Sequence, residues 1–211
     1  MRPVILTSAY LPPVEYFTKL YGAPYVILDC HDHYVKQTYR NRCIIAGPDG
    51  PLALTLPIVH EGKGKMPTRD IRLSRHGDWR HLHWNALKSC YENSPFFEYM
   101  ADDFLAIYRQ DFTYLVDFNT ALQELVCRWL GLSPDIRPAE CYVDASTVDA
   151  DDFRETIRPK TGYEADQAFT PTPYYQVFQQ QNGFLPNLSI VDLLFNVGPE
   201  ARLVLKQSIK D

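Results

Sequence analysis

Two short apolar runs on either side of a proline-bounded segment constrain the fold of this chain most. Residues 3–7 and 25–28 are short and apolar, which is typical of buried strands. Residues 14–20 suit a helix, because two prolines precede them and proline is accepted in a first helical turn. Gly22 and Pro24 then end that helix. Two strands joined through one short helix predict a parallel pair, since parallel strands need a crossover connection.

The rest of the chain changes from extended segments to helices. Non-helical elements are expected as a turn at 47–50, strands at 52–59 and 71–73, and an exposed loop at 60–65. Helices are expected at 78–91 with Asp78 as N-cap, 94–108, 118–130, 188–196 and 200–207. Segment 34–43 is too polar for the core, and segment 134–172, rich in proline and aspartate, reads as mostly loop. We expect one α/β domain over residues 1–211, with a mixed or mainly parallel sheet from its N-terminal half and a helical C-terminal half.

Composition excludes several classes of protein. With 45% hydrophobic and 22% charged residues, the chain is ordinary globular material. Its longest uncharged apolar run, at 52–59, is far shorter than the roughly 18 residues of a membrane span, and its first residues lack a signal-peptide pattern. The five cysteines are scattered without a Cys-x-x-Cys pair, which argues against a disulfide framework or a structural zinc site. We therefore expect a cytoplasmic protein without a membrane span.

Charge is distributed unevenly along the chain, whose net charge is −5. Residues 36–80 hold nine Lys and Arg against four Asp and Glu, whereas residues 81–155 hold five against fourteen. Nucleic-acid binders usually carry a global basic excess, so no nucleic-acid partner is expected. Two interpretations remain: a basic pocket for a small anion in an acidic body, or pairing of the two stretches across the fold.

Two His-x-His pairs raise a metal hypothesis. His31 and His33 lie among acidic residues, and on a strand both would share a face. His81 and His83 lie in an expected helix, where they point apart. Ordinary polar and core histidines explain both pairs, so we predict no metal site. Glycine-rich phosphate loops, a nucleophile elbow and a His-Glu-x-x-His motif are all missing, which leaves the cofactor open.

The strongest local signal for a ligand is a basic segment at residues 36–42. Arginines recognise phosphate or carboxylate through two parallel hydrogen bonds, and amides add neutral donors and acceptors. The set suits a small anionic metabolite such as a nucleotide-linked sugar, although a solvated loop is the alternative. Its candidate substrate-binding residues are Lys36, Gln37, Tyr39, Arg40, Asn41 and Arg42.

Two further clusters supply candidates. Arg80, His83 and Trp84 fall near one face of the expected helix, where they could stack on a ring, bind an anion or move a proton. Packing of the tryptophan in a helical core is the alternative. Asn187 precedes the expected helix at 188–196, where it could cap that helix or help to bind an anion.

With these clusters in place, the chain resembles the WbqC-like protein family, and most of all its branch in Bacteroides-type bacteria. The matching stretches spread in order over nearly the whole chain: residues 10–17, 34–42, 79–84, 91, 94–97 and 183–199. Tyr10 in the first stretch joins the candidate substrate-binding residues. Many relatives have Gln-Pro where this chain has Thr7 and Ser8, so any role of that glutamine is not transferred, and nothing is transferred to residues 29–33.

The resemblance implies a role in surface-polysaccharide synthesis, including O-antigen. It points to an acyl or aminoacyl transferase that forms an amide on an amino sugar or a phosphorylated or nucleotide-linked metabolite. In that reading the basic segment holds the substrate and His83 is the general base, because an imidazole near its free pKa suits proton transfer at neutral pH. A non-catalytic metabolite-binding or assembly protein is the alternative, a nucleotidyl-transfer enzyme ranks last, and a homodimer is a further expectation.

Overall fold

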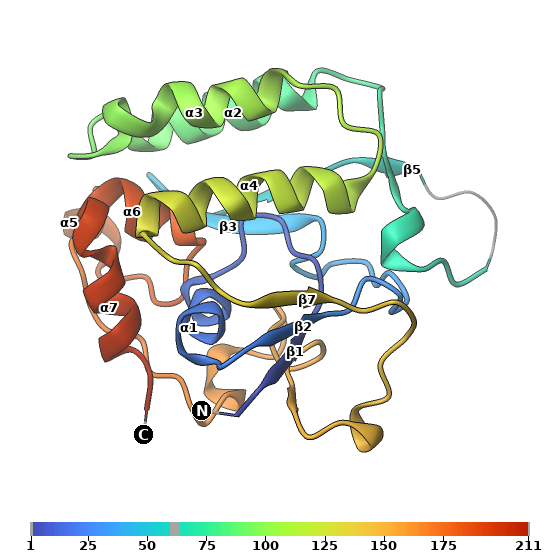
Figure 1. The fold of residues 1–211 in the computed structure, drawn as a ribbon. Coiled ribbons are helices and arrows are strands. Elements are labelled where there is room, and N and C mark those ends of the chain that lie inside the picture. Colours follow the sequence, from blue (N-terminus) through green and yellow to red (C-terminus); the bar gives the residue numbers. More distant parts are fainter. Residues whose placement is uncertain (1, 60–63, 211) are drawn as a thin grey trace.

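The first two strands run parallel, as the opening pattern predicts. Strand β1 (Val4–Leu6) pairs with β2 (Val26–Leu28) in register Val4 to Val26, and helix α1 (Val14–Gly22) connects them. In this computed structural model, which describes residues 2–59 and 64–210, the pair forms the centre of a four-stranded parallel sheet (Figure 1). The predicted α/β fold class is confirmed.

Both edge strands of this sheet come from the segment that the sequence assigned mainly to loop. Strand β7 (Ile136–Pro138) pairs with β2, and β8 (Asp151–Asp152) pairs with β1, which gives the order β7-β2-β1-β8. These strands are very short and not fully buried: β8 is two aspartates, and β7 is one arginine between an isoleucine and a proline, so neither has the apolar run that marks a core strand. Proline is tolerated in β7 because an edge strand needs fewer backbone donors.

Two antiparallel units adjoin the sheet. The predicted turn at 47–50 is confirmed as the tip of a hairpin between β3 (Arg42–Gly47) and β4 (Gly50–Thr55). The single strand expected at 52–59 is divided at Pro57, and its second part, β5 (Ile58–Val59), pairs with β6 (Arg72–Leu73). The expected loop at 60–65 lies mostly outside the described residues.

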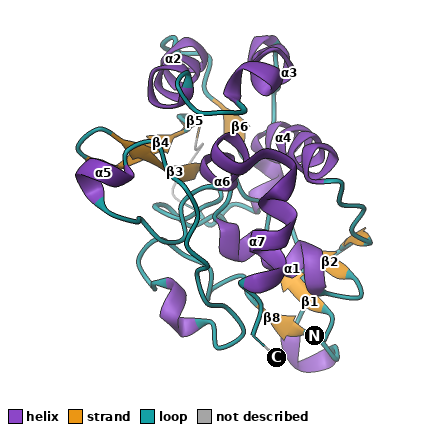
Figure 2. Ribbon diagram, turned by 90° about the vertical axis from the view of Figure 1, so that its left-hand side faces the viewer, coloured by secondary structure: helices purple, strands orange, loops and turns teal. Residues whose placement is uncertain are grey.

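The predicted helices are confirmed with small shifts at their ends. They are α2 (Trp79–Tyr91), α3 (Phe97–Arg109), α4 (Leu115–Leu130), α6 (Ile190–Val197) and α7 (Ala201–Gln207), and the short α5 (Gln179–Asn182) is an addition that the sequence did not predict. Helices α2 and α3 form an outer layer, and α4 lies between that layer and the sheet (Figures 1 and 2). Buried Phe195 of α6 contacts aromatic rings of α2 and α3. Within the described ranges, no helix has the length and apolar character needed to cross a membrane.

Candidate functional site

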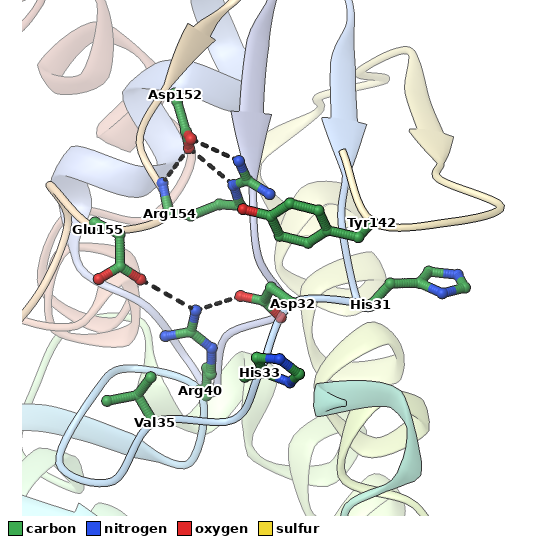
Figure 3. A pocket seen from close by; sticks show the side chains of 9 residues that line it. All are labelled: His31, Asp32, His33, Val35, Arg40, Tyr142, Asp152, Arg154 and Glu155. Atoms are coloured by element: carbon green, nitrogen blue, oxygen red, sulfur yellow. Dashed lines mark hydrogen bonds and ion pairs between the residues drawn. The ribbon is translucent and has the colours of Figure 1, made fainter. Parts of the chain in front are cut away.

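Polar side chains gather where the four parallel strands end. Figure 3 shows the strand arrowheads ending beside these side chains, which border a pocket of about 480 Å³. We call it the carboxyl-edge pocket. Its lining residues are His31, Asp32, His33, Val35, Arg40, Tyr142, Asp152, Arg154 and Glu155.

The position of this pocket is the one at which open parallel sheets bind ligands. The sheet order steps from β1 to β2 and on to β7 in one direction, whereas β8 lies on the other side of β1. Strand order therefore reverses between β1 and β8. Sheets of this kind bind ligands outside the carboxyl ends of their strands, at such a reversal. Asp152 and Arg154, at the end of β8, line the pocket at that point.

Arg154 joins the ends of β8 and β2. Its Nε and Nη2 atoms donate to the two carboxylate oxygens of Asp152 at 2.9 and 2.6 Å, and its Nη1 donates to Asp29 Oδ2 at 2.5 Å. Asp29 is fully buried and also accepts the backbone N–H of His31 at 2.8 Å. The hydrogen bonds that Arg154 donates to Asp152 raise the pKa of Arg154, so this guanidinium is a fixed cation with a carboxylate on each side.

Arg40 reaches the pocket from a buried position. Its side chain is 2% exposed, its Nη2 donates to Asp32 Oδ2, and the same nitrogen lies 3.7 Å from Glu155 Oε1. Asp32 is held in turn by Thr68, whose hydroxyl donates to Oδ1 at 2.6 Å. The Nε atom of Arg40 is buried and has no hydrogen-bond partner among residues 2–59 and 64–210. This predicted cation therefore lines the pocket, although its unpaired Nε has almost no surface that a ligand could reach.

The rim of the pocket carries exposed groups that a substrate could contact. His31 is half-buried, and His33 is exposed. The ring of Tyr142 is 59% exposed and lies beneath the guanidinium of Arg154, whose carbon is 5.0 Å from the ring centre. Among the residues that the structure describes, no three His, Cys, Asp or Glu side chains are arranged to hold a metal ion.

Other residues of the predicted basic segment are dispersed. Lys36 and Gln37 are exposed on the loop, whereas Tyr39 is buried and lines a second pocket of about 210 Å³. The second pocket also includes Arg158 and Asn187. The segment therefore contributes to two pockets through neighbouring residues that point in different directions.

The expectation that residues 34–43 are too polar for the core is wrong for its second half. Arg40 and Asn41 are buried, and the Asn41 amide donates to the carbonyl oxygen of Leu56 at 2.9 Å. Arg42 lies at the start of β3, where its Nε donates to the hydroxyl of Thr55 at 3.0 Å. Bonds to other segments offset part of the cost of this burial, although Arg40 Nε and Asn41 Oδ1 lack a hydrogen-bond partner in the described part of the chain.

The predicted site residues Arg80 and Trp84 lie in the outer layer formed by α2 and α3 (Figure 1). Trp84 stacks on Phe97 of α3 with ring centres 5.8 Å apart, so it packs between the two outer helices. Arg80 pairs with Asp111 at 3.1 Å and lies over the ring of Trp79, 4.6 Å from its centre. Neither Arg80 nor Trp84 lines the carboxyl-edge pocket.

Pairing across the fold accounts for part of the uneven charge. Arg75 and Arg80 of the basic stretch share Asp111 of the acidic stretch, each at 3.1 Å, and Arg40 pairs with Glu155 at 3.7 Å. The two interpretations of the charge pattern therefore coexist, because Arg40 is both an ion-pair partner and a wall of a pocket.

His83 lies on the buried face of α2. Its Nδ1 lies 2.9 Å from the hydroxyl of Tyr10, which in turn lies 2.5 Å from the hydroxyl of Tyr108. Burial lowers the pKa of His83 to about 4, although a hydrogen bond with the Thr55 backbone opposes the shift. The imidazole is therefore neutral near pH 7. It does not line the carboxyl-edge pocket, and its role as a general base stays a prediction.

This histidine should make stability depend on pH. The folded pKa of about 4 lies below the usual value near 6.5, so between these values the unfolded chain binds the proton that the folded protein excludes. Stability should fall by about 3 kcal/mol from this group as pH drops from 6.5 to 4. His83→Asn keeps an acceptor for Tyr10 and should flatten that slope in urea unfolding curves. Equal slopes in the two proteins would show that another group dominates.

Asn187 binds a different helix from the one expected. Its Oδ1 accepts the backbone N–H of Glu15 at 2.9 Å, and its Nδ2 donates to Glu15 Oε2 at 2.8 Å. It therefore caps α1, whose N-cap position holds Pro13, while Ser189 stands at the N-cap position of α6. Burial raises the pKa of Glu15 to about 8, although Asn187 opposes the shift. The predicted cap of the following helix is thus corrected to a contact between distant segments.

A family model, the WbqC-like protein family, matches residues 7–157 and 154–204. The chain belongs to the WbqC-like protein family. An uncharacterized protein of Mycobacterium tuberculosis, Rv1507c, is 28% identical over 232 residues, an alignment that covers 95% of each chain. No solved structure matches the chain significantly. The Bacteroides-type branch stays a prediction, whereas the predicted family is confirmed.

Several residues of the pocket in this WbqC-like chain escaped the sequence reasoning. Asp29, Asp152 and Arg154 form the charged floor, and Tyr142 and Glu155 stand at the rim. One signal for them existed: Asp29 directly follows the predicted strand at 25–28, and carboxyl ends of parallel strands are where ligands bind. The others follow strands too short and polar to be recognised.

Proposed function

We propose that this WbqC-like protein is a cytoplasmic transferase that forms an amide, with an acyl or aminoacyl donor, in the synthesis of a bacterial surface polysaccharide. Its acceptor would be an amino sugar or a related phosphorylated or nucleotide-linked metabolite. One observation carries the proposal: the buried Arg40 guanidinium lines the carboxyl-edge pocket beside Asp32 and Glu155, and Asp152 lines the same pocket. A guanidinium suits the phosphate of such a compound, and a carboxylate such as that of Asp152 suits its ammonium group.

The reaction needs a base at the amine. The nitrogen of the acceptor would attack the carbonyl carbon of an activated acyl donor, so that a C–N bond forms and the bond to the leaving group breaks. A side chain must take the proton that the nitrogen loses. His31 and His33 stand at the pocket, and an imidazole suits this transfer at neutral pH. His83 stays a second predicted base, and Tyr10, Lys36, Gln37, Tyr39, Asn41, Arg42, Arg80, Trp84 and Asn187 stay predicted substrate contacts.

A ligand screen with a matched pair of variants tests the proposal. Thermal shifts would be measured with nucleotides, nucleotide-linked amino sugars, coenzyme A esters and free amino acids. Tyr142→Ala removes an exposed ring from the pocket, whereas Tyr99→Ala removes one of similar exposure, 74%, from α3. We expect a nucleotide-linked amino sugar to stabilise both the unaltered protein and the Tyr99→Ala variant. The Tyr142→Ala variant should bind the same sugar at least fivefold more weakly. A shift that Tyr142→Ala retains in full would contradict binding at this pocket.

An assay of turnover distinguishes a transferase from a non-catalytic metabolite-binding protein. Incubation of the stabilising sugar with each activated acyl donor, followed by mass spectrometry, should show an amide product. Loss of product in a His31→Gln or His33→Gln variant that still binds the sugar would identify the base. Binding without product under every donor would instead support a metabolite-binding protein of the same pathway.

The expected homodimer stays a prediction.

A further inference from the structure

One acidic side chain contacts an arginine of the carboxyl-edge pocket and an arginine of the second pocket. Glu155 lies between Arg40, which lines the first pocket, and Arg158, which lines the second. Its Oε1 is 3.7 Å from Arg40 Nη2, and its Oε2 contacts Arg158 Nη2. Two guanidinium groups therefore share one carboxylate. That carboxylate is 63% exposed, whereas the Arg40 side chain is 2% exposed and that of Arg158 is 25% exposed.

Both arginines carry donors that the protein leaves unused. The Nε atoms of Arg40 and Arg158 are buried, and neither has a hydrogen-bond partner in the described part of the chain. Burial and the nearby charge of Arg40 both lower the pKa of Arg158. The two guanidinium groups are thus held close together by one exposed carboxylate. Because both Nε atoms have almost no accessible surface, a ligand would bind through the terminal Nη atoms, and its negative charge would offset the repulsion between the two cations.

We propose that Arg40 and Arg158 form a binding site for a phosphoryl group, which Glu155 fills with its own carboxylate when no ligand is bound. A phosphate or pyrophosphate offers more charge and more acceptor oxygens than one carboxylate, and arginine recognises it through paired hydrogen bonds. Asp32 would keep Arg40 in place throughout, because it is buried and held by Thr68. The exposed side chain of Glu155 is free to swing into solvent.

The two pockets suit the two ends of a phosphate-linked compound. They measure about 480 and 210 Å³; Glu155 lines the first, and its ion-pair partner Arg158 lines the second. A nucleotide-linked amino sugar has a pyrophosphate at its centre, with a base and ribose on one side and a sugar on the other. This inference rests on the proposed function, because it assigns the phosphate arm of the same substrate class. The site adds Arg158 and the displacement of Glu155 to that proposal.

Binding of inorganic pyrophosphate, measured by isothermal titration calorimetry, tests the site. Glu155→Gln removes the competing charge and should bind about tenfold more tightly than the unaltered protein. Arg158→Gln should bind at least tenfold more weakly, and the double variant should not regain the affinity of Glu155→Gln. Glu98→Gln is the control, because Glu98 is an exposed acid on α3 and its removal changes the net charge equally.

Three results would overturn the site. They are a gain in Glu98→Gln equal to that in Glu155→Gln, a gain that persists when Arg158 is also replaced, and no pyrophosphate binding by Glu155→Gln. The outcome is independent of catalysis. Pyrophosphate binding with the expected pattern but no amide product would contradict the transferase proposal and support the anion site. Amide formation without that binding pattern would contradict the anion site and leave the transferase proposal standing.

Discussion

Replacing Arg154 with leucine is expected to lower the free energy of unfolding by about 3–5 kcal/mol. The substitution leaves Asp29 fully buried without the guanidinium that lies 2.5 Å from it, and it removes the two bonds to Asp152. An unpaired buried charge is costly because the interior solvates it poorly, so breaking such a pair costs more than the pair contributes. Chemical denaturation of the variant at pH 7 measures the loss.

Two further variants make this test specific. Adding Asp29→Asn to Arg154→Leu removes the orphaned charge and should restore part of the stability, because the amide can still accept a backbone N–H. Arg137→Leu is the matched control. Arg137 also pairs with an aspartate, Asp135, and also lies over a tyrosine ring, but it is more than half exposed. Its loss should cost less than 1 kcal/mol. Similar losses for Arg154 and Arg137 would show that the floor of the pocket is not held by this pair.

The second large effect is expected from Arg40→Ala, which should also cost about 3–5 kcal/mol without any ligand present. Arg40 is 2% exposed, and its removal leaves the buried carboxylate of Asp32 with the Thr68 hydroxyl as its side-chain partner among residues 2–59 and 64–210, and with little access to water. Arg42→Ala should cost less than 1 kcal/mol, because that side chain makes one exposed hydrogen bond to Thr55. Melting curves of the two single variants give the comparison.

The different stability costs of replacing Arg40 and Arg42 decide how ligand binding can be tested. A double alanine variant at Arg40 and Arg42 would lose stability and binding together, so its loss of binding would identify neither role. A small effect of Arg40→Ala on melting would contradict the buried pair described above. The exposed residues Glu155 and Tyr142 are better probes of the pocket, since their replacement removes few buried contacts.

The sequence predicted the elements that bury a continuous apolar face. The strands at 4–6 and 26–28 and helix α6 were expected from short apolar runs, and α4 was expected from an apolar stripe at helical spacing. Helices α1 and α2 were expected from the residues that begin them, a proline pair and Asp78. Strands β7 and β8 were not expected, because segments of two or three residues at a sheet edge are too short to show an apolar run or a period. Their pairing is decided by the partners β2 and β1, which lie more than 100 residues away in the chain.

The candidate site was predicted only in part for the same reason. Arg40 was singled out by its chemistry, and the structure places it at the pocket. Local spacing could not show that Asp32 neutralises it or that Arg42, two residues later, points elsewhere. The pairing of Tyr10 with His83 and of Glu15 with Asn187 likewise joins residues separated by 73 and 172 positions. Contacts of that range follow from topology, which no local pattern contains.

The order of strands in the sheet also has a consequence for the nascent chain. The ribosome releases β1 and β2 early, but their outer neighbours lie at 151–152 and 136–138. At a synthesis rate of about 5–20 residues per second, the central pair waits roughly 5–20 s with both hydrogen-bonding edges open. Until β7 and β8 emerge, those edges can pair with another chain, and early covering of the central pair by the chain's own helices would reduce that exposure.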